Sequence, residues 1–356
     1  MFHECEKCKR RWSYPLPECP YCFVPLKKIA GEKAVVRGAA KVNISTLFHP
    51  NVPYYVFVLE DEFGNFWSYK SEEERVLGDE FKIKANSDPG AVAVWRVKYD
   101  HQEAIEKALD LIGGAGIGAD SKIVVLPTLE KASHSYFRDN TSPEFLSAVL
   151  ELLAGKGVKN ENIIVAGQSF GDLSLGNLGT AAAGGSPAPA MAQKSGLVAA
   201  CQKFGIVPCD LAEGEFEKRG QFEISKKVLD ADLTINLAME KMGRAGATEN
   251  MFRVLKKENY LGRIYLSSEA EIFAALSPLL PNAITIGEAE FVQRPNKIAV
   301  FMGLVLASKN AVNLDRVFNE IAQSAKMPEI IKNIPAGGIP IAGRSIREVQ
   351  YQAEIF

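Results

Sequence analysis

The segments Cys5-Glu-Lys-Cys8 and Cys19-Pro-Tyr-Cys22 open the chain and form a C-x2-C-x10-C-x2-C pattern. Two residues between paired cysteines let both sulfurs reach one ion about 2.3 Å away, and four thiolates make a closed tetrahedral zinc site. Iron in a rubredoxin-like site stays open, because sulfur ligands alone do not distinguish it from zinc. We therefore predict a structural Zn2+ site held by Cys5, Cys8, Cys19 and Cys22, in a zinc ribbon over residues 1–27.

Length and composition indicate an ordinary globular chain of two or three domains. Its 356 residues are 47% hydrophobic and 24% charged, with a net charge of −2. Residues 1–100 carry fifteen Lys and Arg against fourteen Asp and Glu, so we expect no broad basic field and no nucleic-acid partner. The sequence contains no run of about eighteen apolar residues, so we expect no membrane helix. The sequence starts with the cysteine motif rather than with the charged and then apolar segment of a signal peptide. Four metal-bound cysteines with isolated Cys201 and Cys209 favour a reducing, cytoplasmic location.

Residues 28–98 are predicted to form a small β-barrel. Five short strands with turn-rich connections in about seventy residues suit a Greek-key barrel of the oligonucleotide/oligosaccharide-binding (OB) type. The expected strands are Ala34–Ile44, Tyr54–Leu59, Phe66–Tyr69, Phe81–Lys84 and Val92–Val97.

Residues 1–98 resemble the family called domain of unknown function thirty-five, whose members join a rubredoxin-like zinc ribbon to such a barrel. The matching pieces are the cysteine knuckles, Pro53-Tyr-Tyr-Val56, Leu59-Glu60, the Asp61–Gly64 turn and Leu77-Gly-Asp-Glu-Phe81. In that family the barrel accompanies thiolase-superfamily acyltransferases, as a partner chain that holds an acyl-CoA or bridges two enzymes. The resemblance implies acyl-CoA as a ligand and a thiolase-like enzyme subunit as a partner.

Residues 99–119 are predicted to form a linker helix and a glycine-rich hinge. His101–Ile112 has helical apolar spacing, and Gly113–Gly118 ends the helix. The glycine run follows a helix and precedes a strand, which is the reverse of the order in dinucleotide-binding sites. We therefore expect a flexible hinge here rather than a phosphate site.

Residues 120–356 are predicted to form an α/β domain with a mostly parallel sheet. Short apolar strands alternate with amphipathic helices, a pattern typical of a parallel sheet covered on both faces. We expect strands at Ile123–Leu126, Ile163–Ala166, Ile206–Cys209, Leu233–Leu237, Arg263–Leu266, Ile284–Ile286 and Ile298–Phe301, and helices at Pro143–Gly155 and Ala190–Phe204.

Ligands of such domains bind at the carboxyl ends of the parallel strands. Lys131, His134, Arg138 and Lys241 are the candidate catalytic residues, because converging positive charge suits a carboxylate or a CoA thioester. A lone loop histidine such as His134 is nevertheless more often solvated than catalytic. The loops expected at this edge also carry Thr128, Asp139, Gln168, Ser169, Asp172, Asp210, Glu240 and Arg244.

Most of residues 120–325 resemble a second family, called domain of unknown function three-six-two. Family members typically carry a Lys-Thr-His segment after the asparagine-containing strand, whereas this chain has Lys241 and Thr248 without the histidine. Chemistry that depends on that histidine is therefore not expected here. The cysteine-rich ferredoxin module of the family is also missing, so we predict no iron–sulfur cluster. The matching passages are Thr141-Ser-Pro143, Asn162–Gly167, Leu229–Leu237, Leu304–Ser308 and Ala311–Val317.

The motif Gly167-Gln-Ser169-Phe-Gly171 is similar to the nucleophile elbow of serine hydrolases. The residues after it predict a loop where an elbow needs a helix, and no histidine follows Ser169 in the chain. We therefore do not expect serine hydrolysis. The small-residue loop Gly176–Pro189 is predicted to be a lid or crossover, with phosphate or carboxylate binding as the alternative.

Three functions stay open from the sequence. The favoured one is an accessory acyl-CoA-binding or scaffold subunit that associates with a thiolase-superfamily acyltransferase. The second is an enzyme that acts on an anionic substrate through the four candidate catalytic residues. The weakest is single-stranded nucleic-acid binding by the barrel, with Phe66, Trp67 and Tyr69 as stacking residues.

Overall fold

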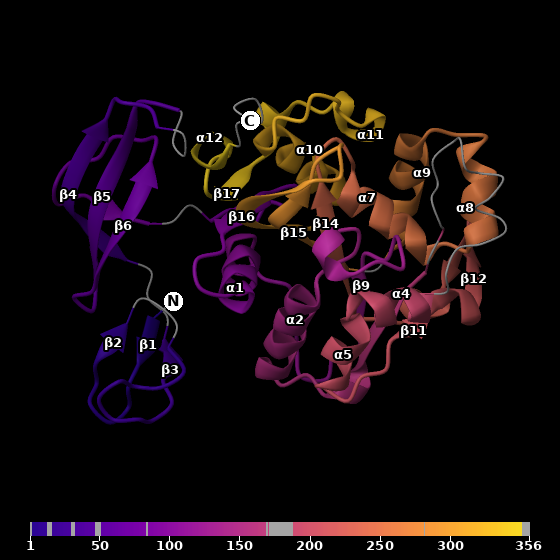
Figure 1. The fold of residues 1–356 in the computed structure, drawn as a ribbon, viewed down its shortest axis with the longest axis horizontal. Coiled ribbons are helices and arrows are strands. Elements are labelled where there is room, and N and C mark those ends of the chain that lie inside the picture. The colour runs from indigo at the N-terminus through magenta and orange to yellow at the C-terminus, as the bar shows by residue number, and fades with distance from the viewer. Residues whose placement is uncertain are drawn as a thin grey trace. The chain divides into compact units, whose positions relative to one another are not determined.

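The chain divides into two compact units, Met1–Lys84 with Gly343–Ile355, and Ala85–Ala342 (Figure 1). The computed structural model describes residues 2–12, 16–29, 33–46, 51–82, 85–168, 170, 188–280 and 282–350. The chain therefore leaves the first unit after Lys84 and returns to it at Gly343. Within the described ranges, no helix is both long enough and apolar enough to cross a membrane.

The cysteine knuckles connect the strands of a three-stranded antiparallel sheet in the first unit. These strands are β1 (Phe2–Glu4), β2 (Arg11–Trp12) and β3 (Lys27–Ile29), in the order β2-β1-β3. The Lys9 N–H donates to the Cys5 carbonyl at 2.8 Å, and the Phe23 N–H donates to the Cys19 carbonyl at 2.9 Å. The two knuckles thus repeat one backbone turn.

A four-stranded antiparallel sheet follows in the same unit. Alternate side chains on one of its faces are buried, so the period of two sets which face forms the core. The core residues include Val36, Phe57, Leu59, Tyr69 and Phe81. The strands are β4 (Ala34–Val42), β5 (Tyr54–Asp61), β6 (Phe66–Ser71) and β7 (Glu80–Phe81), in the order β6-β5-β4-β7.

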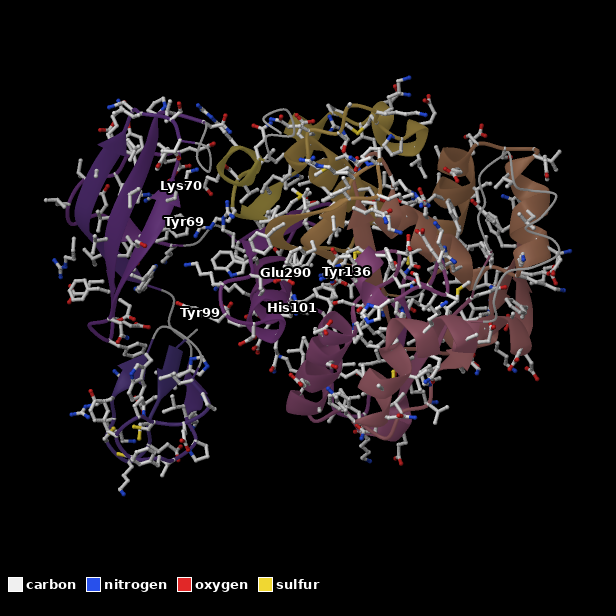
Figure 2. The ribbon with its side chains drawn as sticks, in the orientation of Figure 1. Tyr69, Lys70, Tyr99, His101, Tyr136 and Glu290 are labelled. Atoms are coloured by element: carbon white, nitrogen blue, oxygen red, sulfur yellow. The ribbon has the colours of Figure 1, made fainter. Side chains whose placement is uncertain are left out.

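The end of the chain completes the first unit. The guanidinium of Arg344 lies 3.8 Å from the centre of the Tyr69 ring and donates to the Lys70 carbonyl at 2.9 Å. Tyr69 and Lys70 both lie on β6 (Figure 2). The short helix α12 (Ile346–Val349) begins with a capping box formed by Ser345 and Glu348. Residues 343–350 are therefore part of the packing of this unit.

An eight-stranded sheet forms the body of the second unit, in the order β11-β10-β9-β14-β15-β16-β8-β17. The neighbours from β11 to β15 pair in parallel, and β16 pairs antiparallel with both β15 and β8. The strands are β8 (Val92–Arg96), β9 (Ile123–Pro127), β10 (Ile163–Gly167), β11 (Cys209–Asp210), β14 (Leu233–Lys241), β15 (Ala283–Gln293), β16 (Ala299–Ser308) and β17 (Ile341–Gly343).

Helices cover both faces of this sheet, as expected for strands that are apolar on both sides. One face carries α1 (His101–Leu111), α2 (Pro143–Gly155) and α5 (Leu197–Gln202), and the other carries α7 (Gly246–Met251) and α10 (Ala311–Ile321) (Figure 1). The remaining elements are α4 (Ala188–Ser195), the hairpin β12 (Phe216–Arg219) with β13 (Phe222–Ser225), α6 (Lys226–Leu229), α8 (Lys257–Ile264), α9 (Glu269–Leu276) and α11 (Glu329–Lys332).

The structure differs from the sequence predictions at several places. Val92–Val97, expected in the barrel, contributes β8 to the large sheet, and the expected linker helix is α1, which packs against β8 and β16. The first compact unit ends at Lys84 and the second begins at Ala85, whereas the sequence predicts a barrel to residue 98 and a linker over residues 99–119. Arg263–Leu266, expected as a strand, lies at the end of α8, and Tyr265 and Leu266 are exposed because they face away from the core. The helix expected over Ala190–Phe204 is interrupted at Gly196, whose φ of 85° no α-helix accommodates.

Replacement of Gly246 tests how closely α7 packs on β14. A Cβ atom at Gly246 would lie 2.8 Å from the Met239 carbonyl oxygen, so Gly246→Ala forces the backbone to shift. We expect a loss of about 1–3 kcal/mol in the free energy of unfolding, measured by urea titration. Gly262→Ala in α8 is the control, because its Cβ meets nothing within 4 Å, and it should gain about 0.5–1 kcal/mol. Equal stabilities of the two variants would contradict this account.

Candidate functional site

The four knuckle cysteines meet in one cluster. Their sulfurs all lie within 4.8 Å of one another, and the Cys8 and Cys19 sulfurs are 3.7 Å apart. A disulfide would need about 2.05 Å, whereas sulfurs held 2.3 Å from a central ion at tetrahedral angles are about 3.8 Å apart. The Cys8 N–H also donates to the Cys5 sulfur at 3.4 Å. The cluster therefore has the donor set and the spacing to hold a metal ion.

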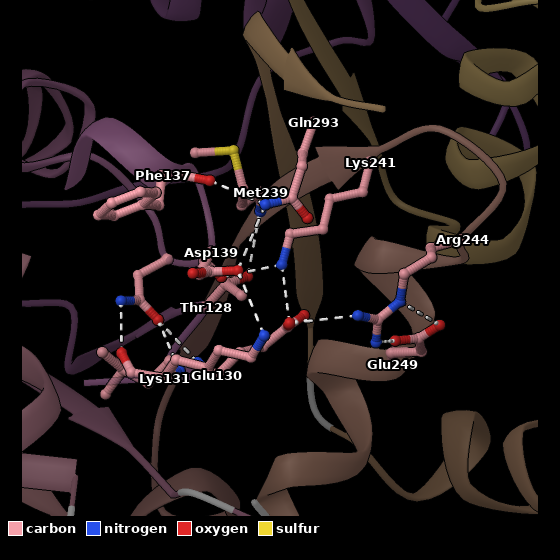
Figure 3. Close-up of polar contacts among 12 residues, drawn as sticks. Thr128, Glu130, Lys131, Phe137, Asp139, Met239, Lys241, Arg244, Glu249 and Gln293 are labelled. Atoms are coloured by element: carbon pink, nitrogen blue, oxygen red, sulfur yellow. Dashed lines mark hydrogen bonds and ion pairs between the residues drawn. The ribbon is translucent and has the colours of Figure 1, made fainter. Parts of the chain in front are cut away.

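A second cluster lies where β9 and β14 end (Figure 3). Lys241 is the last residue of β14, and its side chain is 3% exposed. Its ammonium pairs with Glu130 at 2.8 Å and donates to the Asp139 carbonyl at 2.9 Å. Glu130 also pairs with Arg244 at 3.2 Å, and Arg244 in turn pairs with Glu249. The cluster is thus a chain of alternating charges at the carboxyl edge of the sheet.

Two side chains fix the loop that carries Glu130. The Asn140 Oδ1 accepts from the N–H groups of Glu130 and Lys131 at 2.8 and 3.2 Å, and its Nδ2 donates to the Lys131 carbonyl at 2.8 Å. The Thr141 hydroxyl accepts from the Thr128 N–H and donates to the Leu237 carbonyl, each at 2.8 Å. Since Leu237 lies on β14, the loop is tied to the strand that presents Lys241.

The charges of the cluster perturb one another. Burial alone would raise the pKa of Glu130, but the positive charges of Lys241 and Arg244 outweigh it and lower that pKa to about 2. Burial lowers the pKa of Lys241, and Glu130 offsets part of that effect. Glu130 therefore stays ionised across the physiological range and needs a cationic neighbour.

The structure brings together only part of the predicted catalytic set. Lys131 is exposed, and its ammonium lies 3.9 Å from Asp139, beside Lys241. His134 is exposed, and its Nδ1 accepts from the Tyr136 N–H at 3.2 Å, so it starts a short 3₁₀ turn. Arg138 points to Glu288 at 3.5 Å and lies over the Phe291 ring. Lys131 and Lys241 thus share one neighbourhood, while His134 and Arg138 contact other groups.

Of the other predicted loop residues, Gln168 and Asp210 form hydrogen bonds to backbone groups. The Gln168 Nε2 donates to the carbonyls of Arg253 and Leu255 at 3.1 and 2.8 Å, and Asp210 accepts from the Ala212 N–H at 2.9 Å. Ser169 and Asp172 lie outside the described residues, as does the loop over 176–187. The hydrolase-like motif is therefore described only at Gly167, Gln168 and Phe170.

Several charged contacts were not predicted from the sequence. Glu130 lies three residues after the last residue of β9, Pro127, and could have been found as a residue near the strand end. His101 and Glu290 come from distant segments, and their Nε2 and Oε2 atoms are 3.0 Å apart (Figure 2). No local pattern connects residues 101 and 290, so that pair needed the fold.

Two buried carboxyls lie on the other face of β14. Asp315 on α10 accepts from the N–H groups of Ala247 and Thr248 at 2.9 and 2.8 Å and from the Thr248 hydroxyl at 2.6 Å. Neither carboxyl oxygen of Glu240 has a hydrogen-bond partner, although both are buried. Burial raises the pKa of Asp315 to about 7, and burial together with Asp315 raises that of Glu240 well above its usual range.

The comparisons with known proteins support the second resemblance. Residues 123–320 match the family described as "Domain of unknown function (DUF362)". The chain belongs to this family. Its matched region includes β9, β14 and α10, and so both the Lys241 cluster and the two buried carboxyls.

The first unit has no comparable family assignment. The solved structure described as "Ltp2-ChsH2(DUF35) aldolase" is 19% identical over 25% of this chain and 75% of that chain. Its TM-score is 0.21, which is too low to indicate a shared fold. No curated protein matches the sequence.

The cysteine cluster predicts one metal ion per chain. Elemental analysis of the purified protein should find close to one equivalent, and Cys19→Ser should lower it because three thiolates bind more weakly than four. Chelation should expose residues 2–29 to protease while the DUF362 domain stays intact, since so small a sheet has no core of its own. The matched control is Cys201→Ser, which should keep the full metal content. Metal retained by the Cys19 variant would contradict the assigned ligand set.

The buried Glu240 predicts a pH-dependent stability. Because its pKa is raised in the folded chain, the folded state binds more protons than the unfolded state, and the free energy of unfolding falls as pH rises above about 4.5. Glu240→Gln should therefore flatten the pH dependence between pH 5 and 8, measured by urea titration, without a loss of stability at pH 8. Glu258→Gln on the exposed surface should leave the dependence unchanged. A large loss at pH 8 for the Glu240 variant would show that the fold needs the carboxylate.

Proposed function

We propose that this protein is an accessory subunit that binds acyl-CoA and associates with a thiolase-superfamily acyltransferase, rather than an enzyme in its own right. In this proposal the first unit is a zinc ribbon joined to an OB-type barrel, and the DUF362 domain is a rigid binding body. The resemblance of residues 1–98 to the ribbon-and-barrel family supports the first part. The cysteine cluster with its antiparallel sheet is consistent with it.

The main support for a non-catalytic role is that Lys241 is buried and already bound to other groups of the protein. A catalytic lysine must reach a substrate, but this one is 3% exposed and already bound to Glu130 and the Asp139 carbonyl. To release it would leave Glu130 without its closest cation in a largely buried position, at a cost of about 3–5 kcal/mol. His134, the remaining candidate base, is exposed and caps a turn. Lys241 therefore acts mainly to hold the edge of the sheet together.

A second function is favoured by one observation at the same edge. The side chains of Lys131 and Arg244 are 47% and 41% exposed, next to a buried lysine whose pKa is lowered. Perturbed titratable groups often gather at active sites, and these two cations suit a carboxylate or a CoA thioester. The alternative is an enzyme that acts on such an anion.

Purification from the native source distinguishes the two functions. A tagged chain should co-purify with an acyltransferase that mass spectrometry identifies, and the isolated protein should release heat on titration with acetyl-CoA. The coenzyme should be recovered unchanged after incubation with the chain alone. The proposal fails if the chain has no acyltransferase partner and acetyl-CoA gives no heat. Consumption of acetyl-CoA by the chain alone would instead favour the enzyme.

A further inference from the structure

The second cysteine knuckle presents two exposed aromatic side chains. Tyr21 is 65% exposed and Phe23 is 73% exposed, and they flank Cys22 of the cysteine cluster that could hold a metal ion. The guanidinium of Arg10 lies 3.8 Å from the centre of the Tyr21 ring, so the first knuckle contributes a cation to the same surface. We call Arg10, Tyr21 and Phe23 the knuckle tip. Aromatic and arginine side chains of this kind are enriched at protein interfaces.

Phe23 also has a strained backbone. Its φ is 52°, in the left-handed region that glycine tolerates and that a bulky side chain rarely adopts. Lys9 holds the equivalent position of the first knuckle, with a φ of 59°. A glycine at position 23 would adopt this φ without strain. A polar residue there would not expose an aromatic ring to solvent. An exposed, strained phenylalanine that packs little of its own unit is the kind of outlier that points to a binding role.

The charge of the ribbon differs from that of the rest of the chain. Residues 1–27, the predicted ribbon, hold five Lys and Arg against three Glu, which leaves thirty-six Lys and Arg against forty Asp and Glu elsewhere. The ribbon therefore carries a small positive charge on a chain that is otherwise slightly acidic, and Arg10 is the cation placed against the aromatic side chains of the knuckle tip. Its charge complement is an acidic protein surface with an apolar pocket for the ring.

We infer that the knuckle tip is the surface by which the ribbon binds its partner enzyme, with Phe23 inserted into an apolar pocket bordered by acidic side chains. The inference rests on the proposed function, because it takes the acyltransferase as the partner. Base stacking by a nucleic acid is the weaker reading: Arg10 already covers one face of Tyr21, and the basic charge is small. A second copy of this chain, whose remainder is acidic, is the other possible occupant.

The glycine substitution separates binding from folding. Phe23→Gly removes the ring and relieves the strain, so metal content should stay at the wild-type value and the unfolding midpoint should not fall. Affinity for the purified acyltransferase, measured by interferometry on immobilised chain, should drop about tenfold or more. Lys9→Gly is the matched control: it relieves the same backbone strain in the other knuckle and removes no aromatic ring. Its affinity should stay within about threefold of wild type.

The outcomes separate this inference from the proposed function. If the wild-type chain binds no acyltransferase, the function and the inference both fail. If it binds one and Phe23→Gly binds equally well, only the inference fails. Two further measurements on both chains identify other occupants. Loss of a fluorescein-labelled oligo(dT) complex on Phe23→Gly would assign the tip to nucleic acid, and a wild-type dimer that dissociates in the variant would assign it to self-association; either result overturns the inference.

Discussion

The pair between Lys241 and Glu130 is the interaction on which the carboxyl edge of the large sheet depends. Burying either charge without its partner would strongly destabilise the folded state, so each of the two residues requires the other. The pair joins the end of β14 to the loop after β9, and Asn140 and Thr141 then fix that loop residue by residue. The edge is thus held by a buried ion pair together with hydrogen bonds, whose directional geometry makes it specific.

The loop after β14 is restrained from both faces of the strand. On one face Glu130 binds Lys241 and Arg244. On the other, α10 holds the same loop: the Asn319 Oδ1 accepts from the Gly243 N–H at 3.0 Å, and its Nδ2 donates to the Arg244 carbonyl at 2.8 Å. Arg244 is therefore held on one face through its side chain, by Glu130, and on the other through its backbone carbonyl, by Asn319. Because Arg244 is already held in place, binding of a ligand to its guanidinium would cost little conformational entropy of the side chain.

The sequence predicted what is encoded locally. Ser142 followed by Pro143 is an N-cap signal, and α2 has the predicted bounds. The cysteine spacing predicted the cluster, and the apolar runs predicted β9, β10 and β14. The predictions that failed concern contacts between residues that are far apart in the sequence. β8 was grouped with the barrel because it follows the other short strands, whereas its pairing with β16 joins residues some two hundred positions apart. The partners of Lys241 were missed for the same reason, since a charge network is visible only once the strands are aligned.

The return of the chain to its first unit affects how the protein is made. Arg344 and its neighbours pack on β6 of that unit, yet they are synthesised only after the whole of the large sheet. At translation rates of about 5–20 residues per second, the strands β4 to β7 wait roughly 13–53 s for the segment that completes them. During that interval the surface of β6 that Arg344 covers lacks its partner, while the strands of the second unit are being synthesised. Of the two units, the first is therefore the later one to be completed.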